Sequence, residues 1–186
     1  MIIRKAEKKD VKGIISPLIM ALDEMKTIFS GCEKEEEIIA KYEEFFLLDE
    51  GRYSYKNFYV GEGDEEIAGI IVVYYSDDVE KLDNVMLREL NKNGVIRKEF
   101  EKEFYENEYY IDSLAVNSAY QGRGIARKLM EFAEKKGKEQ GYEKMSLLVH
   151  IDKEKAFSIY KKMGYEEDSK IVLYGETYRH MVKQIK

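Results

Sequence analysis

The chain has 186 residues, a formal net charge of −6 and a single cysteine, Cys32. A chain of this length can bury most of its apolar surface without metals or disulfides, so we expect one domain over residues 1–186. The negative charge disfavours nucleic acid as a partner and favours a cationic one, such as an amine.

Cysteine content and hydropathy indicate whether to expect a disulfide, a metal site or a membrane-spanning segment. Cys32 has no partner for an internal disulfide, and no Cys/His cluster has metal-ligand spacing, so we expect no metal and a cytoplasmic location. No apolar run approaches the ~18 residues of a membrane span, and residues 1–6 become charged too soon for a signal peptide. A membrane partner is therefore not expected.

The N-terminal segment predicts a strand followed by a helix. Residues 2–6 are typical of a short strand, and Asp10 can cap a helix whose apolar positions continue with a 3.6-residue period to Met25. The only proline, Pro17, falls inside this pattern and removes one helix hydrogen bond. We therefore expect a kink or a break near Ser16.

A second helix and a hairpin come next. Ser30 and Glu33 have the spacing of a capping box, and the apolar positions that follow keep one helical face. Residues 49–56 are polar and turn-like. Two apolar, β-rich runs, residues 58–62 and 67–75, surround a short polar loop and predict an antiparallel hairpin.

Residues 77–107 form a charged insertion, with nine acidic and six basic residues. A helical spacing of apolar residues begins at Val79, and Asn93-Gly94 interrupts it before Phe100 and Phe104. The composition favours a solvated helical excursion, and the alternatives are a substrate lid or a dimer arm.

A strand, a turn and a helix then follow in close succession. The apolar run 109–116 precedes Gln121-Gly122-Arg123-Gly124-Ile125-Ala126, which opens a helical pattern. The two glycines let the backbone turn tightly, and the amides at a helix N-terminus favour an anion such as phosphate. The glycines could instead make a plain strand-to-helix turn. The Lys-Ser/Thr of a P-loop and the third glycine of a dinucleotide fingerprint are absent.

The C-terminal part predicts further strands and one helix. Gly141 is suited to end the preceding helix, and residues 144–149 are typical of a strand. Another helix ends at Met163, just before a glycine. Residues 171–174 and 178–183 are expected to close the sheet.

Two motifs carry a family resemblance. Gln121-x-x-Gly124-x-Ala126, directly after a strand, resembles the signature of the GCN5-related N-acetyltransferases, the GNAT superfamily. The stretch from Ala156 through Tyr160 to Gly164-Tyr165 resembles the family's Ala-x-x-x-Tyr-x-x-x-Gly-Phe helix end. The resemblance implies an α/β (α+β) fold with a GNAT-like mixed, mostly antiparallel sheet of six or seven strands flanked by helices. It also implies an acetyl-CoA-dependent N-acetyltransferase.

The resemblance further implies a cofactor site. In the family the backbone of the strand before the signature pairs with the pantetheine arm, and the loop amides hold the pyrophosphate. The residues expected to bind acetyl-CoA are therefore Leu114, Ala115, Val116, Gln121, Gly122, Arg123, Gly124, Ile125, Ala126, Arg127, Phe157 and Tyr160.

The resemblance places Tyr160 beside the CoA sulfur as proton donor, although its helical spacing also suits a core tyrosine. For the base, Glu108, Tyr110 and Asp112 share one strand face because side chains alternate. The position that carries glutamate in the histone-acetylating branch holds Tyr110 here. Asp112 and Glu108 remain candidates, with Asp112 preferred and a solvated strand-edge charge favoured for Glu108. Backbone N–H groups near Leu114 are expected to stabilise the oxyanion.

Other positions depart from the family or fall outside its motifs. Lys153 stands where many relatives carry an asparagine, which leaves cofactor contacts on that side open, and His150 and His180 are expected to be structural or on the surface. The acceptor expected is the primary amine of a small metabolite, acetylated by direct transfer in a ternary complex. The alternatives are a protein amino group and a non-catalytic CoA-binding sensor. Family analogy favours a homodimer.

Overall fold

The computed structural model describes residues 1–64 and 66–186, so Glu65 of the expected hairpin loop lies outside the described residues. Seven strands form one mixed sheet in the order β1-β2-β3-β4-β5-β7-β6. Only β4 and β5 run parallel, and every other neighbouring pair is antiparallel. The mixed, mostly antiparallel sheet implied by the resemblance is therefore confirmed. The strands are β1 (Ile3–Lys5), β2 (Phe58–Glu62), β3 (Ile67–Tyr75), β4 (Tyr109–Val116), β5 (Lys144–His150), β6 (Glu166–Leu173) and β7 (Glu176–Gln184).

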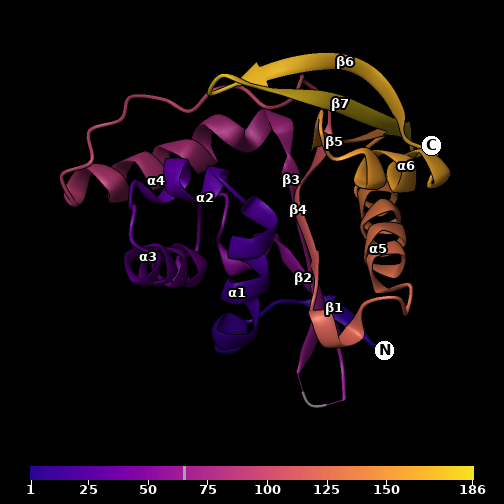
Figure 1. Cartoon of the computed structure of the whole chain (residues 1–186), viewed down its shortest axis with the longest axis horizontal. Coiled ribbons are helices and arrows are strands. Elements are labelled where there is room, and N and C mark those ends of the chain that lie inside the picture. The colour runs from indigo at the N-terminus through magenta and orange to yellow at the C-terminus, as the bar shows by residue number, and fades with distance from the viewer. Residues whose placement is uncertain (65) are drawn as a thin grey trace.

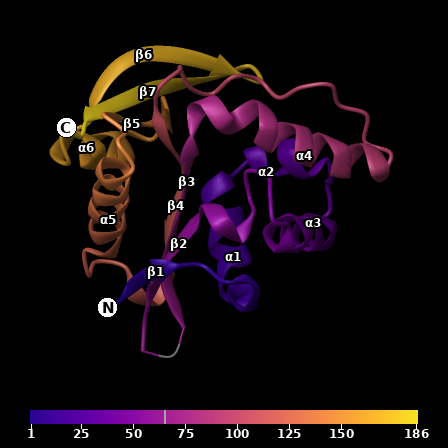
Figure 2. The same ribbon diagram turned by 180° about the vertical axis from the view of Figure 1, so that it is seen from behind.

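Helices cover both faces of the sheet (Figure 1). Four helices from the first half of the chain lie on one face, and two from the second half lie on the other, as the reverse view also shows (Figure 2). Each face has its own apolar cluster, so the sheet is buried on both sides. The helices are α1 (Val11–Leu22), α2 (Met25–Ser30), α3 (Glu35–Leu47), α4 (Val79–Lys92), α5 (Ile125–Glu139) and α6 (Glu154–Lys162).

Of the kink or break expected near Ser16, the break is wrong, because helix α1 continues through Pro17. The proline costs about 3 kcal/mol inside a helix. Five apolar side chains of α1 are buried against the sheet, and each stabilises the helix by roughly 1.5–3 kcal/mol. Packing therefore offsets the lost hydrogen bond. The chain breaks instead at Asp23, whose φ of 53° turns it into α2.

Two predicted helix caps are wrong. The Asp10 carboxylate does not cap α1, because it accepts hydrogen bonds from the Arg4 guanidinium and from the Glu7 N–H, 2.8 Å away. Ser30 is the last residue of α2, and α3 starts after Lys34 without a side-chain cap. Other nearby groups take these acceptors instead, Arg4 and the Glu7 N–H at Asp10 and the Cys32 N–H at Ser30.

The segment between α4 and β4, residues 93–108, is named the strap. It leaves the far end of α4 and passes the tip of the β6–β7 hairpin before it enters β4 (Figure 1). Its Phe100 and Phe104 are buried, as are Met86 and Leu90 of α4. The solvated excursion favoured for residues 77–107 is therefore wrong, because these apolar side chains complete the core beneath α2 and α4.

Candidate active site

The site begins where β4 and β5 separate. Their parallel ladder extends only from Tyr109–Met145 to Ile111–Leu147, and both strands continue beyond it. The register of β3 with β4 also shifts between Val72 and Val73, so Asp112 forms a bulge in β4 without a partner in β3. From Ser113 to Val116, β4 pairs with β3 and with no other strand of the described residues. The diverging strands leave backbone amide groups of β4 facing a gap.

A groove of about 550 Å³ follows this free edge of β4 to the N-terminus of α5. Gly122 and Gly124 have φ angles of 76° and 72°, and a Cβ added to either would meet no atom within 4 Å. The loop is therefore open to a ligand, and Gly124 directly precedes the helix, whose first N–H groups have no intrahelical acceptors. Of the expected cofactor residues, the groove is lined by Leu114, Ala115, Val116, Gln121, Gly122, Gly124, Ile125, Ala126 and Arg127.

Three expected cofactor residues lie elsewhere. Arg123 is outside the groove lining, and its guanidinium lies 5.0 Å from the ring of Tyr120. The Phe157 ring packs under the Arg179 guanidinium, 4.4 Å away, and lines neither the groove nor the neighbouring cavity. Tyr160 lines the neighbouring cavity instead of the groove. The spacing of these residues could not predict which side of each element faces the groove.

The neighbouring cavity, named the acceptor cleft, has a volume of about 560 Å³. Met20 and Ala21 line both this cleft and the groove, so the two spaces adjoin at α1. Six carboxylates and one lysine line the cleft, which makes it strongly acidic. These residues are Asp23, Glu24, Glu103, Asp112, Asp152, Glu176 and Lys153.

Asp112 and Tyr160 both line the acceptor cleft. The Asp112 carboxylate accepts hydrogen bonds from the hydroxyls of Tyr74 (2.6 Å), Ser113 (2.8 Å) and Tyr53 (3.5 Å). No lysine or arginine in the described part of the chain forms an ion pair with it. Burial raises the pKa of Asp112, and this effect outweighs the opposing effects of Arg52 and the three hydroxyls. An uncompensated buried carboxylate of this kind is suited to accept a proton.

Tyr160 is held at the C-terminal end of α6. The helix ends at Lys162, Gly164 follows with a φ of 88°, and the N–H of buried Tyr165 donates to the Tyr160 carbonyl. The Tyr160 ring packs in the apolar cluster, so the interpretation as a core tyrosine is partly correct. Its hydroxyl makes no hydrogen bond to any residue in 1–64 or 66–186, and burial raises its pKa. The hydroxyl is thus available to a ligand in the cleft.

Glu108 is not the solvated edge charge that the sequence favoured. Its side chain is completely buried and accepts hydrogen bonds from Ser146 Oγ (2.6 Å) and His180 Nε2 (3.0 Å), and Lys144 Nζ lies 2.9 Å away. Burial alone would raise its pKa, but His180, Ser146 and Lys144 lower the pKa of Glu108 to about 2. Glu108 therefore fixes β4 to β5 and β7, and it does not line the acceptor cleft.

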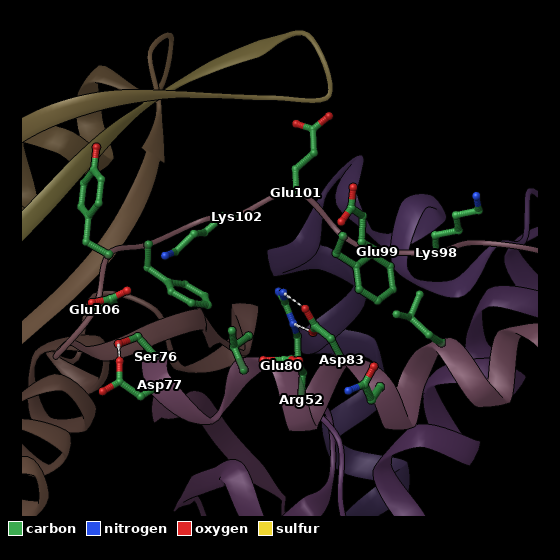
Figure 3. A pocket seen from close by; sticks show the side chains of 16 residues that line it. Arg52, Ser76, Asp77, Glu80, Asp83, Lys98, Glu99, Glu101, Lys102 and Glu106 are labelled. Carbon is green, nitrogen blue, oxygen red and sulfur yellow. Dashed lines mark hydrogen bonds and ion pairs between the residues drawn. The ribbon is translucent and has the colours of Figure 1, made fainter.

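Arg52 and Glu103 form a buried ion pair that sequence reasoning missed. Arg52 lies in the stretch expected to be a polar turn, yet its side chain is 1% exposed. It binds Asp83 of α4 with two hydrogen bonds and also binds Glu103 of the strap. Figure 3 shows Arg52 and Asp83 facing each other beneath the strap. The partners lie 31 and 51 residues away in sequence, so no local pattern could have indicated them.

Lys153, which replaces the family's asparagine, lies at the acceptor cleft. Its ammonium lies 3.2 Å from the Asp23 carboxylate, so the pair joins the α1–α2 turn to the start of α6. His150 also lines the cleft, with Nε2 3.1 Å from Glu176, whereas His180 is buried. Among residues 1–64 and 66–186, no three His, Cys, Asp or Glu side chains are grouped to hold a metal ion, and no helix is long and apolar enough to cross a membrane.

Comparison with known proteins agrees with this geometry. Residues 22–165 match the Acetyltransferase (GNAT) family, and the chain belongs to this family. It is an acetyltransferase by that membership. A crystal structure of an acetyltransferase has a TM-score of 0.81 and 27% identity, with all of both chains covered. The N-acetyltransferase from Staphylococcus aureus Mu50 also has a TM-score of 0.81, with 26% identity over 98% of this chain and 100% of that one.

A shorter match links the chain to a curated relative. Acetyltransferase SG1711 of Sodalis glossinidius (strain morsitans) is 38% identical over 63 residues. The matched stretch is 34% of this chain and 44% of that protein. The similarity in sequence is therefore confined to a part of both proteins.

Proposed function

We propose that this protein transfers an acetyl group from acetyl-CoA directly to the primary amine of a small metabolite. The proposal rests on two adjoining spaces at the free edge of β4. One is an open groove lined by backbone amides, and the other is an acidic cleft. The groove suits a long donor with a phosphate group, and the cleft suits a cationic acceptor. A protein amino group is the alternative acceptor.

The residues present fit acetyl-CoA. The open space over Gly122 and Gly124 leaves room for a pyrophosphate at the N-terminus of α5, where amides and the helix dipole favour negative charge. The unpaired edge from Asp112 to Val116 suits the amides of a pantetheine arm. When bound, acetyl-CoA supplies the thioester that reacts at the end of this edge.

Asp112 accepts the proton that the acceptor must lose. An ammonium has no lone pair, so its nitrogen attacks only after deprotonation, and the raised pKa of Asp112 makes the carboxylate a stronger base than an exposed aspartate. As the C–N bond forms and the C–S bond breaks, the electron pair of the latter passes to sulfur. The first proton lost by nitrogen resides on Asp112 and then returns to solvent. The second, lost once the C–N bond has formed, passes through solvent to the Tyr160 hydroxyl and replaces the proton given to sulfur.

Tyr160 stabilises the departing sulfur. A phenol with a pKa near 10 is a weaker acid than a thiol with a pKa near 8.5, and burial raises the pKa of Tyr160. The hydroxyl therefore acts first as a hydrogen-bond donor to the developing thiolate and then passes its proton as solvent replaces it. A backbone N–H near Leu114 would bind the carbonyl oxygen, a contribution of roughly 2.7–4 kcal/mol in acyl transfer.

The test is release of free CoA thiol from acetyl-CoA over a panel of small amines, amino acids and short peptides. Acetyl-CoA binding is measured in parallel by calorimetry. Turnover with small amines is expected. Turnover confined to peptides would move the acceptor to a protein amino group, and tight binding without turnover would indicate a CoA-binding sensor.

A further inference from the structure

The strap contributes Glu103 to the lining of the acceptor cleft. The Glu101 N–H donates to the Tyr174 hydroxyl (2.9 Å), and the Tyr174 N–H donates to the Glu101 carboxylate (2.7 Å). Tyr174 lies at the turn between β6 and β7, so this pair fastens the strap to the tip of the hairpin (Figure 1). Glu103 of the strap and Leu173 of the hairpin both line the cleft. The insertion and the hairpin thus both contribute to the cleft.

A buried excess of negative charge lies where the strap lines the cleft. The Glu103 side chain, 7% exposed, binds Arg52 and accepts a hydrogen bond from the Tyr110 hydroxyl (3.0 Å). The single guanidinium of Arg52 is shared with Asp83. One positive charge therefore faces two carboxylates, and Asp112 nearby adds a third that has no cation of its own.

Keeping these negative charges buried costs free energy. Burial raises the pKa of Glu103 more than Arg52 lowers it, and burial likewise dominates at Asp112. A cation that binds beside these carboxylates stabilises their ionised forms, because each desolvated negative charge then has a positive partner.

The charges that remain after proton transfer to Asp112 indicate where such a cation binds. When the reacting nitrogen passes its proton to Asp112, that carboxylate becomes neutral, but the group of Arg52, Asp83 and Glu103 keeps one negative charge. A monoamine has no positive charge left at this point. An acceptor with a second ammonium still has one, and it can stay beside Glu103 while the first nitrogen reacts.

Resting on the proposed function, we propose that the acceptor is a small linear diamine or polyamine and that Glu103 is the specificity-determining residue that binds its distal ammonium. The reacting amine lies between Asp112 and Tyr160, and the alkyl chain extends toward the strap. A peptide N-terminus would bring no second ammonium to Glu103, so the charges of the cleft favour a diamine over a polypeptide.

The test compares putrescine with butylamine and cadaverine with pentylamine, which differ by one ammonium at equal chain length. For each amine, kcat/KM and binding to the CoA complex by calorimetry are measured for the native protein, for Glu103→Gln and for Glu99→Gln. Glu99 is an exposed strap residue that does not line the acceptor cleft, so Glu99→Gln makes the same change without the proposed contact.

Native protein is expected to prefer each diamine by about tenfold or more, in line with a hydrogen bond to a charged group. Glu103→Gln should remove this preference, with a larger loss for the diamines than for the monoamines and unchanged CoA binding, and Glu99→Gln should retain it. Equal use and binding of diamines and monoamines by the native protein would overturn the inference, as would an equal loss for both in Glu103→Gln. If diamines bind selectively through Glu103 but no amine is acetylated, the inference holds and the proposed acetyl transfer fails.

Discussion

The Gly124→Ala variant tests two roles of Gly124, its effect on the stability of the loop conformation and its effect on acetyl-CoA binding. Gly124 has a φ of 72°, a conformation that costs an L-residue roughly 1–2 kcal/mol. The added Cβ meets no atom within 4 Å, so no steric cost adds to this strain. We therefore expect Gly124→Ala to lower the free energy of unfolding by about 1–2 kcal/mol. Because Gly124 lines the groove, the methyl group should also weaken acetyl-CoA binding by about tenfold, or about 1.4 kcal/mol.

Gly141→Ala is the matched control. Gly141 has a φ of 87° and the same open surroundings, but it follows the other end of α5, about 20 Å away along the helix. Urea denaturation should show a similar loss of stability in both variants, whereas calorimetry should show weakened acetyl-CoA binding only in Gly124→Ala. Equal affinities in the two variants would refute the placement of the pyrophosphate at this loop.

Three further predictions concern the charged and hydroxyl groups of the site. Tyr160→Phe should lower kcat by at least about tenfold with little change in acetyl-CoA affinity, and a normal kcat would reject its role at sulfur. Asp112→Asn should remove the acidic limb of the pH profile of kcat/KM, which in the native protein rises as Asp112 loses its proton through its raised pKa; an unchanged limb would point to another base. Glu108, with a folded pKa of about 2, should stabilise the native protein above pH 4.5 and lose that contribution, about 3 kcal/mol, as the pH falls toward 2. Glu108→Gln should therefore flatten the pH dependence of urea denaturation in this window, and a native-like slope in the variant would contradict the assignment.

The parts of the fold encoded by neighbouring residues were predictable. The strand ending at Val116, the turn at Gly122 and Gly124, and the helix up to Gly141 follow from glycine positions and apolar periodicity, and all three are confirmed. The hairpin of β2 and β3 is confirmed for the same reason.

The surroundings of the acidic residues were not predictable from local patterns. Glu108 looked like an exposed strand-edge charge because its partners Ser146 and His180 lie 38 and 72 residues later. Only the pairing of β4 with β5, and of β5 with β7, brings these side chains together. Residues far apart in sequence thus decide which carboxylates are structural and which face the cleft.

The strap misled the sequence interpretation in a different way. Its charged residues suggested a solvated excursion, but Phe100 lies 5.0 Å from the Phe29 ring and Phe104 lies 4.6 Å from the Tyr110 ring. Two buried aromatic residues anchor the segment, and most of its charged residues are exposed. The average composition of the segment does not distinguish its buried aromatic residues from its exposed charged residues.

The most direct test of the account is a crystal structure of the protein with CoA and a primary amine bound. The account predicts the pyrophosphate at the amides that follow Gly122, the pantetheine arm along the free edge of β4, and the amine nitrogen between Asp112 and the sulfur. A pyrophosphate bound away from the N-terminus of α5, or an amine bound outside the acceptor cleft, would contradict it.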